Sequence, residues 1–168
     1  MVINFSPLNY SFASKPLVIG GKAMEYYGLR KSGEDIDIVV TKSDLFELIK
    51  RYPKNVKDLF GDLGVAVKGF EIWKTIRYLD YDFLAFESVE KADFRVISVE
   101  RLLYMKALAM HIPKNLHDAE LLVEYITSAQ SAKAESIARE NKLLIGEIGS
   151  ISYLERLVAT SANADSTQ

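Results

Sequence analysis

The chain has 168 residues, and its 21 Lys and Arg residues nearly balance 23 Asp and Glu residues, for a formal net charge of −2. Its 49% hydrophobic and 26% charged residues match an average soluble protein. This composition excludes an intrinsically disordered chain, and the charge balance argues against a protein that binds nucleic acid through bulk positive charge. The length fits one globular domain, alone or with a helical appendage.

Cysteine is absent, which excludes disulfides, thiolate catalysis and cysteine-ligated metal sites. Two histidines leave little room for a multi-histidine zinc site. No apolar run reaches 18 residues, and the N-terminus lacks a basic start followed by an apolar run. We therefore expect a cytoplasmic protein with no membrane segment and no signal peptide.

The first predicted element is a buried strand at Leu17–Ile19, closed by a tight turn at Gly20-Gly21. A helix is predicted over Lys22–Tyr27, with Gly28 as its C-terminal stop. The alternation in Asp35–Val40 predicts a strand with one exposed face at its start and both faces covered at its end.

Next, Thr41 or Ser43 can cap a helix that runs to about Arg51, and Pro53 ends it. A loop follows, and then a β-rich stretch. The strand candidates, rich in aromatic and β-branched residues, are Val65–Val67, Glu71–Tyr78, Tyr81–Phe86 and Phe94–Ile97.

The sequence becomes helical from Ser98 onward. Helices are predicted from Ser98 to about His111, Leu116 to Ser128, Ala132 to about Leu144, and Ile151 to Ala159. We therefore expect a mixed α/β core at residues 1–97, a helical region at residues 98–160 packed on that core, and a disordered tail at residues 161–168.

Two acidic residues on one strand are the first candidate site. Asp35 and Asp37 would point to the same face, with Cα atoms about 6.6 Å apart, twice the strand rise of about 3.3 Å. Carboxylates so placed can converge on a hard cation such as Mg²⁺, which keeps phosphate oxygens in its shell. Gly20 and Gly21, before a helix N-terminus, would let a phosphate approach the backbone.

A third acid lies on the later β-run, where Asp80 and Asp82 again share a face. If this strand lies beside the Asp35 strand, one of the two completes a carboxylate trio that binds metal and accepts a proton from an attacking hydroxyl. Each piece alone also has an ordinary explanation, since a Gly-Gly is often only a turn and alternating acids often mark an exposed sheet face.

Taken together, these motifs resemble the DNA polymerase β-like nucleotidyltransferase superfamily, whose pattern is an apolar residue, Gly, Gly or Ser, a gap, and an Asp-apolar-Asp strand. The matching residues are Ile19-Gly20-Gly21, Asp35-Ile36-Asp37-Ile38 and Tyr81-Asp82-Phe83-Leu84. Downstream, Ser98–Ala109 and Pro113–Leu122 are similar to small bacterial members of the abortive-infection and toxin type. Asn115 stands where those members usually have Asp.

The resemblance implies a mixed sheet flanked by helices, followed by a C-terminal helical region. It implies transfer of an NMP from an NTP to tRNA, a protein hydroxyl or a small molecule, with Mg²⁺ or Mn²⁺ as cofactor. The resemblance further implies metal-binding and catalytic roles for Asp35, Asp37 and Asp82, with Asp80 as a rival to Asp82. The implied nucleotide-binding or phosphate-binding residues are Gly20, Gly21, Lys22, Arg30, Ser32, Lys106 and Lys114.

Partners implied in the same way are the NTP, the acceptor, and a cognate antitoxin or a second copy of the chain. The main alternative is a non-catalytic protein of the same fold that binds a partner as an antitoxin-like or regulatory subunit. A structural α/β domain without a metal site is the third hypothesis.

Overall fold

The computed structural model describes residues 1–59 and 62–148. The chain divides into two compact units, Met1–Tyr125 and a second unit that begins at Ile126. The first unit holds the sheet and all the helices up to the early turns of the last helix, α5 (Pro113–Ile148). The predicted helix Ile151–Ala159 and the predicted disordered tail lie outside the described residues.

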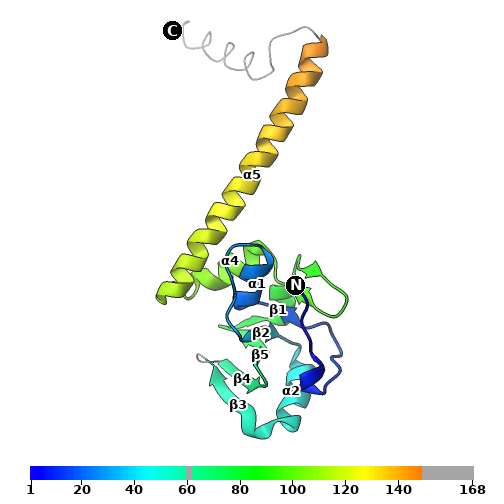
Figure 1. Cartoon of the computed structure of the whole chain (residues 1–168), viewed down its shortest axis with the longest axis vertical. Helices are drawn as coiled ribbons and strands as arrows, with labels where there is room; N and C mark the ends of the chain where they lie inside the picture. Colours follow the sequence, from blue (N-terminus) through cyan, green and yellow to red (C-terminus); the bar gives the residue numbers. More distant parts are fainter. Residues whose placement is uncertain (60–61, 149–168) are drawn as a thin grey trace, which may run out of the picture. The chain divides into compact units, whose positions relative to one another are not determined.

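A mixed sheet forms the centre of the first unit (Figure 1). In the described part of the chain it has seven strands in the order β3-β4-β5-β2-β1-β9-β8. Neighbours β1 and β9 are parallel, as are β2 and β5, whereas the other pairs are antiparallel. The strands are β1 (Leu17–Val18), β2 (Ile36–Val39), β3 (Val56–Leu59), β4 (Asp62–Val67), β5 (Phe70–Trp73), β8 (Val89–Glu90) and β9 (Arg95–Val96).

Helices and a small hairpin surround the sheet. The helices are α1 (Gly20–Tyr26), α2 (Lys42–Arg51), α3 (Tyr81–Ala85), α4 (Val99–Ala107) and α5, with short 3-10 turns at Ser6–Leu8 and Pro53–Asn55. The hairpin pairs β6 (Thr75–Ile76) with β7 (Leu79–Asp80). The mixed α/β fold with a mixed sheet is therefore confirmed.

The strand predicted at Asp35–Val40 shows why this sheet positions a site. Ile38 and Val39 are completely buried, whereas Asp37 is half-buried and Asp35 is exposed. Since side chains alternate along a strand, Asp37 and Ile38 face opposite sides, and Ile38 packs in the apolar core. Thr41 caps α2 as predicted, because its hydroxyl accepts a hydrogen bond from the Asp44 N–H.

Several predictions about elements are wrong. The strand predicted over Glu71–Tyr78 is divided between β5 and β6, with Tyr78 in a turn, and the helix predicted to about His111 ends at Ala107. Gly20 and Gly21 are the first residues of α1 rather than a separate turn, and the loop expected after Pro53 contains β3. Residues Tyr81–Phe86 do not form a strand, because Asp80 caps a helix there and its carboxylate accepts a hydrogen bond of 2.9 Å from the Phe83 N–H. The two helices predicted between Leu116 and Leu144 are one continuous helix, α5.

No helix formed by the described residues combines the length and the apolar character needed to cross a membrane.

Candidate functional site

A cavity of about 400 Å³ opens within the first unit, of a size suited to a small ligand. It is lined by the end of β1, the start of α1, β2 and β5, together with α4 and the first turn of α5. Six of the predicted site residues line this cavity: Gly20, Gly21, Asp35, Asp37, Lys106 and Lys114. The structure therefore brings together residues that lie up to 94 positions apart in the sequence.

Gly20 lies directly against the Asp37 carboxylate. A Cβ placed on Gly20 would lie 1.9 Å from Asp37 Oδ2, and Gly20 has a positive φ of 59°. Any other residue would therefore be strained and would displace the carboxylate. The next residue, Gly21, donates a backbone N–H to the same carboxylate. The first turn of α1 thus holds Asp37 in one place.

Two further acidic residues line the cavity, Asp62 and Glu71, and neither was predicted from the sequence. Strand β5 pairs in parallel with β2, and this register places Glu71 directly beside Asp37. Both residues line the cavity, together with Asp35. In the sequence, Glu71 stands out as a charged residue within the otherwise apolar segment Phe70–Trp73. Its position beside Asp37 could not be inferred, because it depends on the pairing of β2 with β5.

The electrostatics of Asp37 reflect this crowding. Burial and the neighbouring Glu71 carboxylate raise the pKa of Asp37 to about 6, with Asp35 adding to the effect. The Gly21 N–H and the Lys106 ammonium act in the opposite direction. With Asp62, four acidic residues line the cavity, and their like charges repel one another unless a cation lies between them.

The donor set suits Mg²⁺ or Mn²⁺, because carboxylate oxygens are the ligands that these hard cations prefer. In the described parts of the chain, no three His, Cys, Asp or Glu side chains form a group that could hold a metal by themselves. Mg²⁺ usually binds through one or two carboxylates and completes its shell with water and substrate phosphates. The residues present therefore fit a cation that arrives with a phosphate-bearing ligand.

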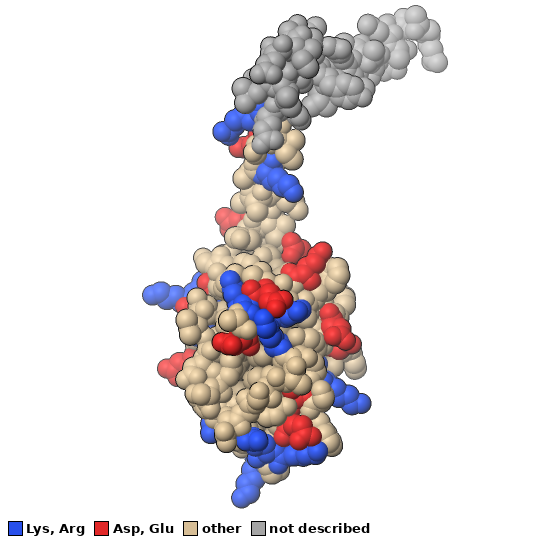
Figure 2. Space-filling view, turned by 90° about the vertical axis from the view of Figure 1, so that its right-hand side faces the viewer, with Lys and Arg blue, Asp and Glu red and all other residues tan. Residues whose placement is uncertain are grey.

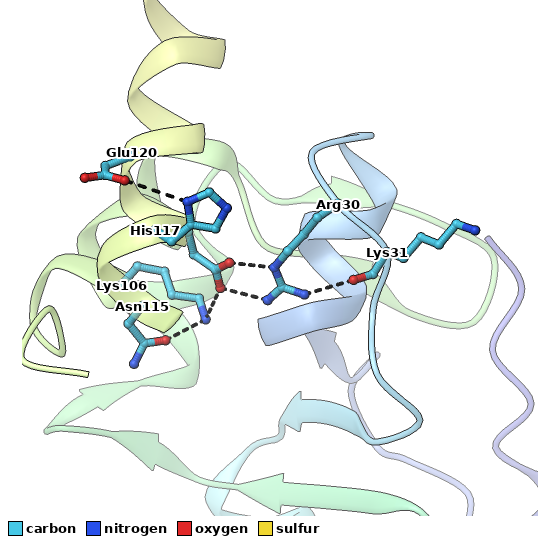
Figure 3. A network of polar contacts seen from close by, with 7 residues as sticks. Arg30, Lys31, Lys106, Asn115, His117 and Glu120 are labelled. Carbon is cyan, nitrogen blue, oxygen red and sulfur yellow. Dashed lines mark hydrogen bonds and ion pairs between the residues drawn. The ribbon is translucent and has the colours of Figure 1, made fainter. Parts of the chain in front are cut away.

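A network of four polar residues, two of them cations, lies beside the carboxylates (Figure 3). We name it the Asp118 cluster, and it consists of Arg30, Lys106, Asn115 and Asp118. Asp118 is completely buried, and its carboxylate contacts Arg30 at 2.5 and 2.8 Å. Lys106 Nζ lies 2.8 Å from Asp118 Oδ2 and donates to Asn115 Oδ1 at 2.9 Å. Of these residues, Lys106 and Asn115 line the cavity.

Two of the predicted phosphate-binding residues pair with each other outside the lining. Lys22 Nζ donates to the Ser32 hydroxyl at 2.6 Å, and that hydroxyl donates to Glu25 at 2.6 Å. Neither Lys22 nor Ser32 lines the cavity. Ser32 nevertheless lies next to Gly21, because the Ser32 Cβ is 3.6 Å from the position that a Cβ on Gly21 would occupy. Arg30 also lies behind the lining, held by Asp118.

Asp82 does not join the other two predicted acids. It is an exposed residue in the first turn of α3 and does not line the cavity. Its rival Asp80 is the N-cap of the same helix. The expectation that their segment forms a strand beside the Asp35 strand is wrong, since β5 occupies that neighbouring place in the sheet.

An apolar wall forms another part of the cavity lining. Its members are apolar side chains: Ile19, Leu59, Trp73, Ile76, Met105, Ala109 and Ile112. Trp73 is 5% exposed and is the only aromatic residue of the lining within the described ranges 1–59 and 62–148. The cavity therefore has an acidic side and an apolar side, the combination that a polar ligand with a flat ring requires.

Comparisons with protein-family models, with curated proteins and with solved structures find no match to this chain.

Proposed function

We propose that the protein is a metal-dependent nucleotidyltransferase that transfers an NMP from an NTP to a hydroxyl-bearing acceptor. The observation that carries this proposal is the fit of Gly20 against the Asp37 carboxylate, with Glu71 beside it in register and Asp35 on the same cavity. This arrangement preserves the expected order of glycines, paired acids and a third acid. It replaces Asp82 with Glu71.

Each side of the cavity has a role in the proposal. One or two carboxylates of the cavity, Asp37 with Glu71 or Asp35, would hold Mg²⁺ or Mn²⁺, and water and substrate phosphates would complete its shell. The cation would neutralise charge on the phosphates. Gly20 and Gly21 admit the triphosphate beside the start of α1, and Lys106 and Lys114 contribute positive charge at the lining. The apolar wall gives the nucleobase a surface that includes the Trp73 ring.

The reaction is an in-line displacement at the α-phosphorus. A bond forms between the acceptor oxygen and phosphorus while the bond to the pyrophosphate oxygen breaks. The acceptor proton passes to a carboxylate of the cavity. Four acidic residues line the cavity, and one that does not hold the cation can accept this proton.

For the acceptor, the proposal keeps tRNA, a protein hydroxyl and a small molecule, and it includes the role of a toxin with a cognate antitoxin or a homodimeric partner. Figure 2 shows acidic and basic side chains close together on one face of the molecule. A mixed surface of this kind favours an acceptor recognised locally at the cavity over one gathered by long-range positive charge.

The test is incorporation of label from each α-labelled NTP into total tRNA, total cell protein and small acceptors, with Mg²⁺ or Mn²⁺. Asp37→Asn and Glu71→Gln should each lower incorporation about 100-fold or more, since both remove a cation-holding oxygen. Asp82→Asn is the matched control, because this exposed acid lies on α3, and it should keep wild-type activity.

Incorporation that survives Asp37→Asn or Glu71→Gln would contradict the proposal, as would loss of incorporation in Asp82→Asn alone. Absence of any incorporation and of any NTP binding by calorimetry would instead favour the partner-binding alternative.

A further inference from the structure

Asp118 is a buried acid that the proposed chemistry does not use. Its side chain has no exposed surface, it does not line the cavity, and it lies at the start of α5. Burial alone would raise the pKa of Asp118, but hydrogen bonds and charges from Arg30 and Lys106 hold that pKa below its usual range. A completely buried carboxylate that stays ionised needs such partners.

The two cations that Asp118 holds come from different parts of the chain. Arg30 lies in the connection between α1 and β2, whereas Lys106 lies near the end of α4 (Figure 3). Both cations interact with the charge of Asp37. The hydrogen bond that Arg30 donates to Asp118 is the main cause that raises the pKa of Arg30, and the Asp37 carboxylate raises it further, while Lys106 lowers the pKa of Asp37. One buried acid therefore fixes two cations next to the carboxylates.

The charge of this cluster is unbalanced. Two cations face one carboxylate, because the fourth member, Asn115, is a neutral amide that accepts a hydrogen bond from Lys106. Lys106 has three N–H donors, and the contacts to Asp118 and Asn115 use two of them. The Lys106 side chain is 9% exposed and lines the cavity, so its remaining donor and the excess positive charge are available at the acidic side.

We propose that Asp118 is a positioning residue that holds Lys106, and through Arg30 the segment behind Gly21, in place to bind the polyphosphate of the substrate. A free Lys side chain loses substantial rotamer freedom when it binds a ligand, whereas one already held by Asp118 and Asn115 has lost it on folding. Arg30 also lies close to the first turn of α1, because its Nη1 is 3.8 Å from the position that a Cβ on Gly21 would occupy. This inference rests on the proposed function, since it concerns the same cavity.

Asp118 could instead serve only to fasten α5 to the rest of the first unit. The two roles differ in what a substitution changes. A fastening residue affects stability alone, whereas a positioning residue affects polyphosphate affinity through Lys106. Asp44 provides a matched control, because it too is completely buried and accepts hydrogen bonds from Tyr10, Ala13 and Thr41, but it does not line the cavity.

The experiment measures, on the full chain with Mg²⁺, the Kd of inorganic tripolyphosphate and of a non-hydrolysable NTP, together with the Tm. We expect Asp118→Asn to weaken both ligands at least tenfold, and Asp44→Asn to lower the Tm while leaving both Kd values unchanged. Lys106→Gln keeps the Arg30–Asp118 pair and should also weaken both ligands. In the Lys106→Gln background, adding Asp118→Asn should cost less than threefold further.

Wild-type affinity in Asp118→Asn would overturn the inference and leave the proposed function standing. An equal loss from Asp118→Asn in the wild-type and Lys106→Gln backgrounds would overturn it as well, because Asp118 would then not act through Lys106. If Asp118→Asn fails to fold, wild-type affinity in Lys106→Gln alone overturns the inference. Absence of NTP binding by the wild type overturns the proposed function, and with it the inference.

Discussion

Gly20 is the residue on which the geometry of the candidate site depends most directly. Gly20→Ala should lower nucleotidyl transfer about 100-fold, because the new Cβ would overlap the Asp37 carboxylate, and it should lower stability by about 1–3 kcal/mol through its positive φ. Activity assays and urea denaturation measure the two effects.

Gly28→Ala is the control for this change. Gly28 also has a positive φ, of 73°, but a Cβ there would meet nothing within 4 Å. This variant should share the loss of stability and keep the activity. Equal activity in the Gly20→Ala and Gly28→Ala variants would show that the contact between Gly20 and Asp37 does not matter for function.

Asp37 is a site where function and stability should conflict. Its pKa in the folded protein is about 6 against an ordinary value of 3.8, so the folded state binds more protons between these values. The charged carboxylate therefore costs stability, fully above about pH 6 and not at all below about pH 4. Asp37→Asn should raise the free energy of unfolding by about 1–3 kcal/mol at pH 7.5 without metal.

Urea denaturation at pH 7.5 and pH 4 measures this effect. The gain should be much smaller at the lower pH, where Asp37 is protonated in the folded state and close to half protonated in the unfolded state. A variant that is less stable than wild type at pH 7.5 would contradict the assignment of Asp37 as a crowded carboxylate.

The residues of the site were only partly predictable from the sequence. Asp35, Asp37 and the two glycines are close in sequence, and alternation along one strand places the two acids on one face. Glu71 and Asp118 were not found, because their roles depend on tertiary structure. Glu71 depends on parallel pairing with β2, and Asp118 depends on its contacts with Arg30 and Lys106.

At the scale of secondary-structure elements, helix-capping residues and residue composition can predict different structures for the same segment. The segment Tyr81–Ala85 has the aromatic content of a strand, yet it forms α3, because Asp80 satisfies the free N–H of Phe83 at the helix start. The helix predicted to begin at Ser98 does begin there, with Ser98 as its N-cap, and the Ser98 hydroxyl accepts a hydrogen bond from the Arg101 N–H. Capping residues were thus better guides here than residue composition.

Residue composition also fails to predict the geometry of the hairpin formed by β6 and β7. Its two turn residues, Arg77 and Tyr78, both have a positive φ, which matches the turn of a two-residue hairpin but is unusual for residues other than Gly, Asn and Asp. Arg77 lines the cavity, so the strained turn presents a cation at the candidate site.

At the scale of the whole molecule, the first unit should be sufficient for the proposed function. All cavity-lining residues and Asp118 lie before Tyr125, which itself packs against Tyr27. A fragment of residues 1–130 should fold cooperatively and keep the NTP affinity and transfer activity of the full chain. Thermal denaturation, calorimetry and the labelled-NTP assay check this.

A fragment that folds but loses NTP binding would show that residues after 130 take part in the site.

The coarse organisation of an α/β part followed by helices was predictable, because periodicity changes near Ser98. The order of strands was not, because β1 pairs with both β2 and β9, and the second pairing joins residues about 78 positions apart.

The position of Asp118 near the end of the first unit has a consequence for the order of synthesis. A nascent chain acquires Gly20, Asp37 and Glu71 first, and it acquires the acid that holds Lys106 only after nearly the whole unit has been made. Domains fold as units during translation, so the cavity would be complete only late. If the proposed function holds, nucleotide binding would therefore begin only after nearly the whole first unit has been synthesised.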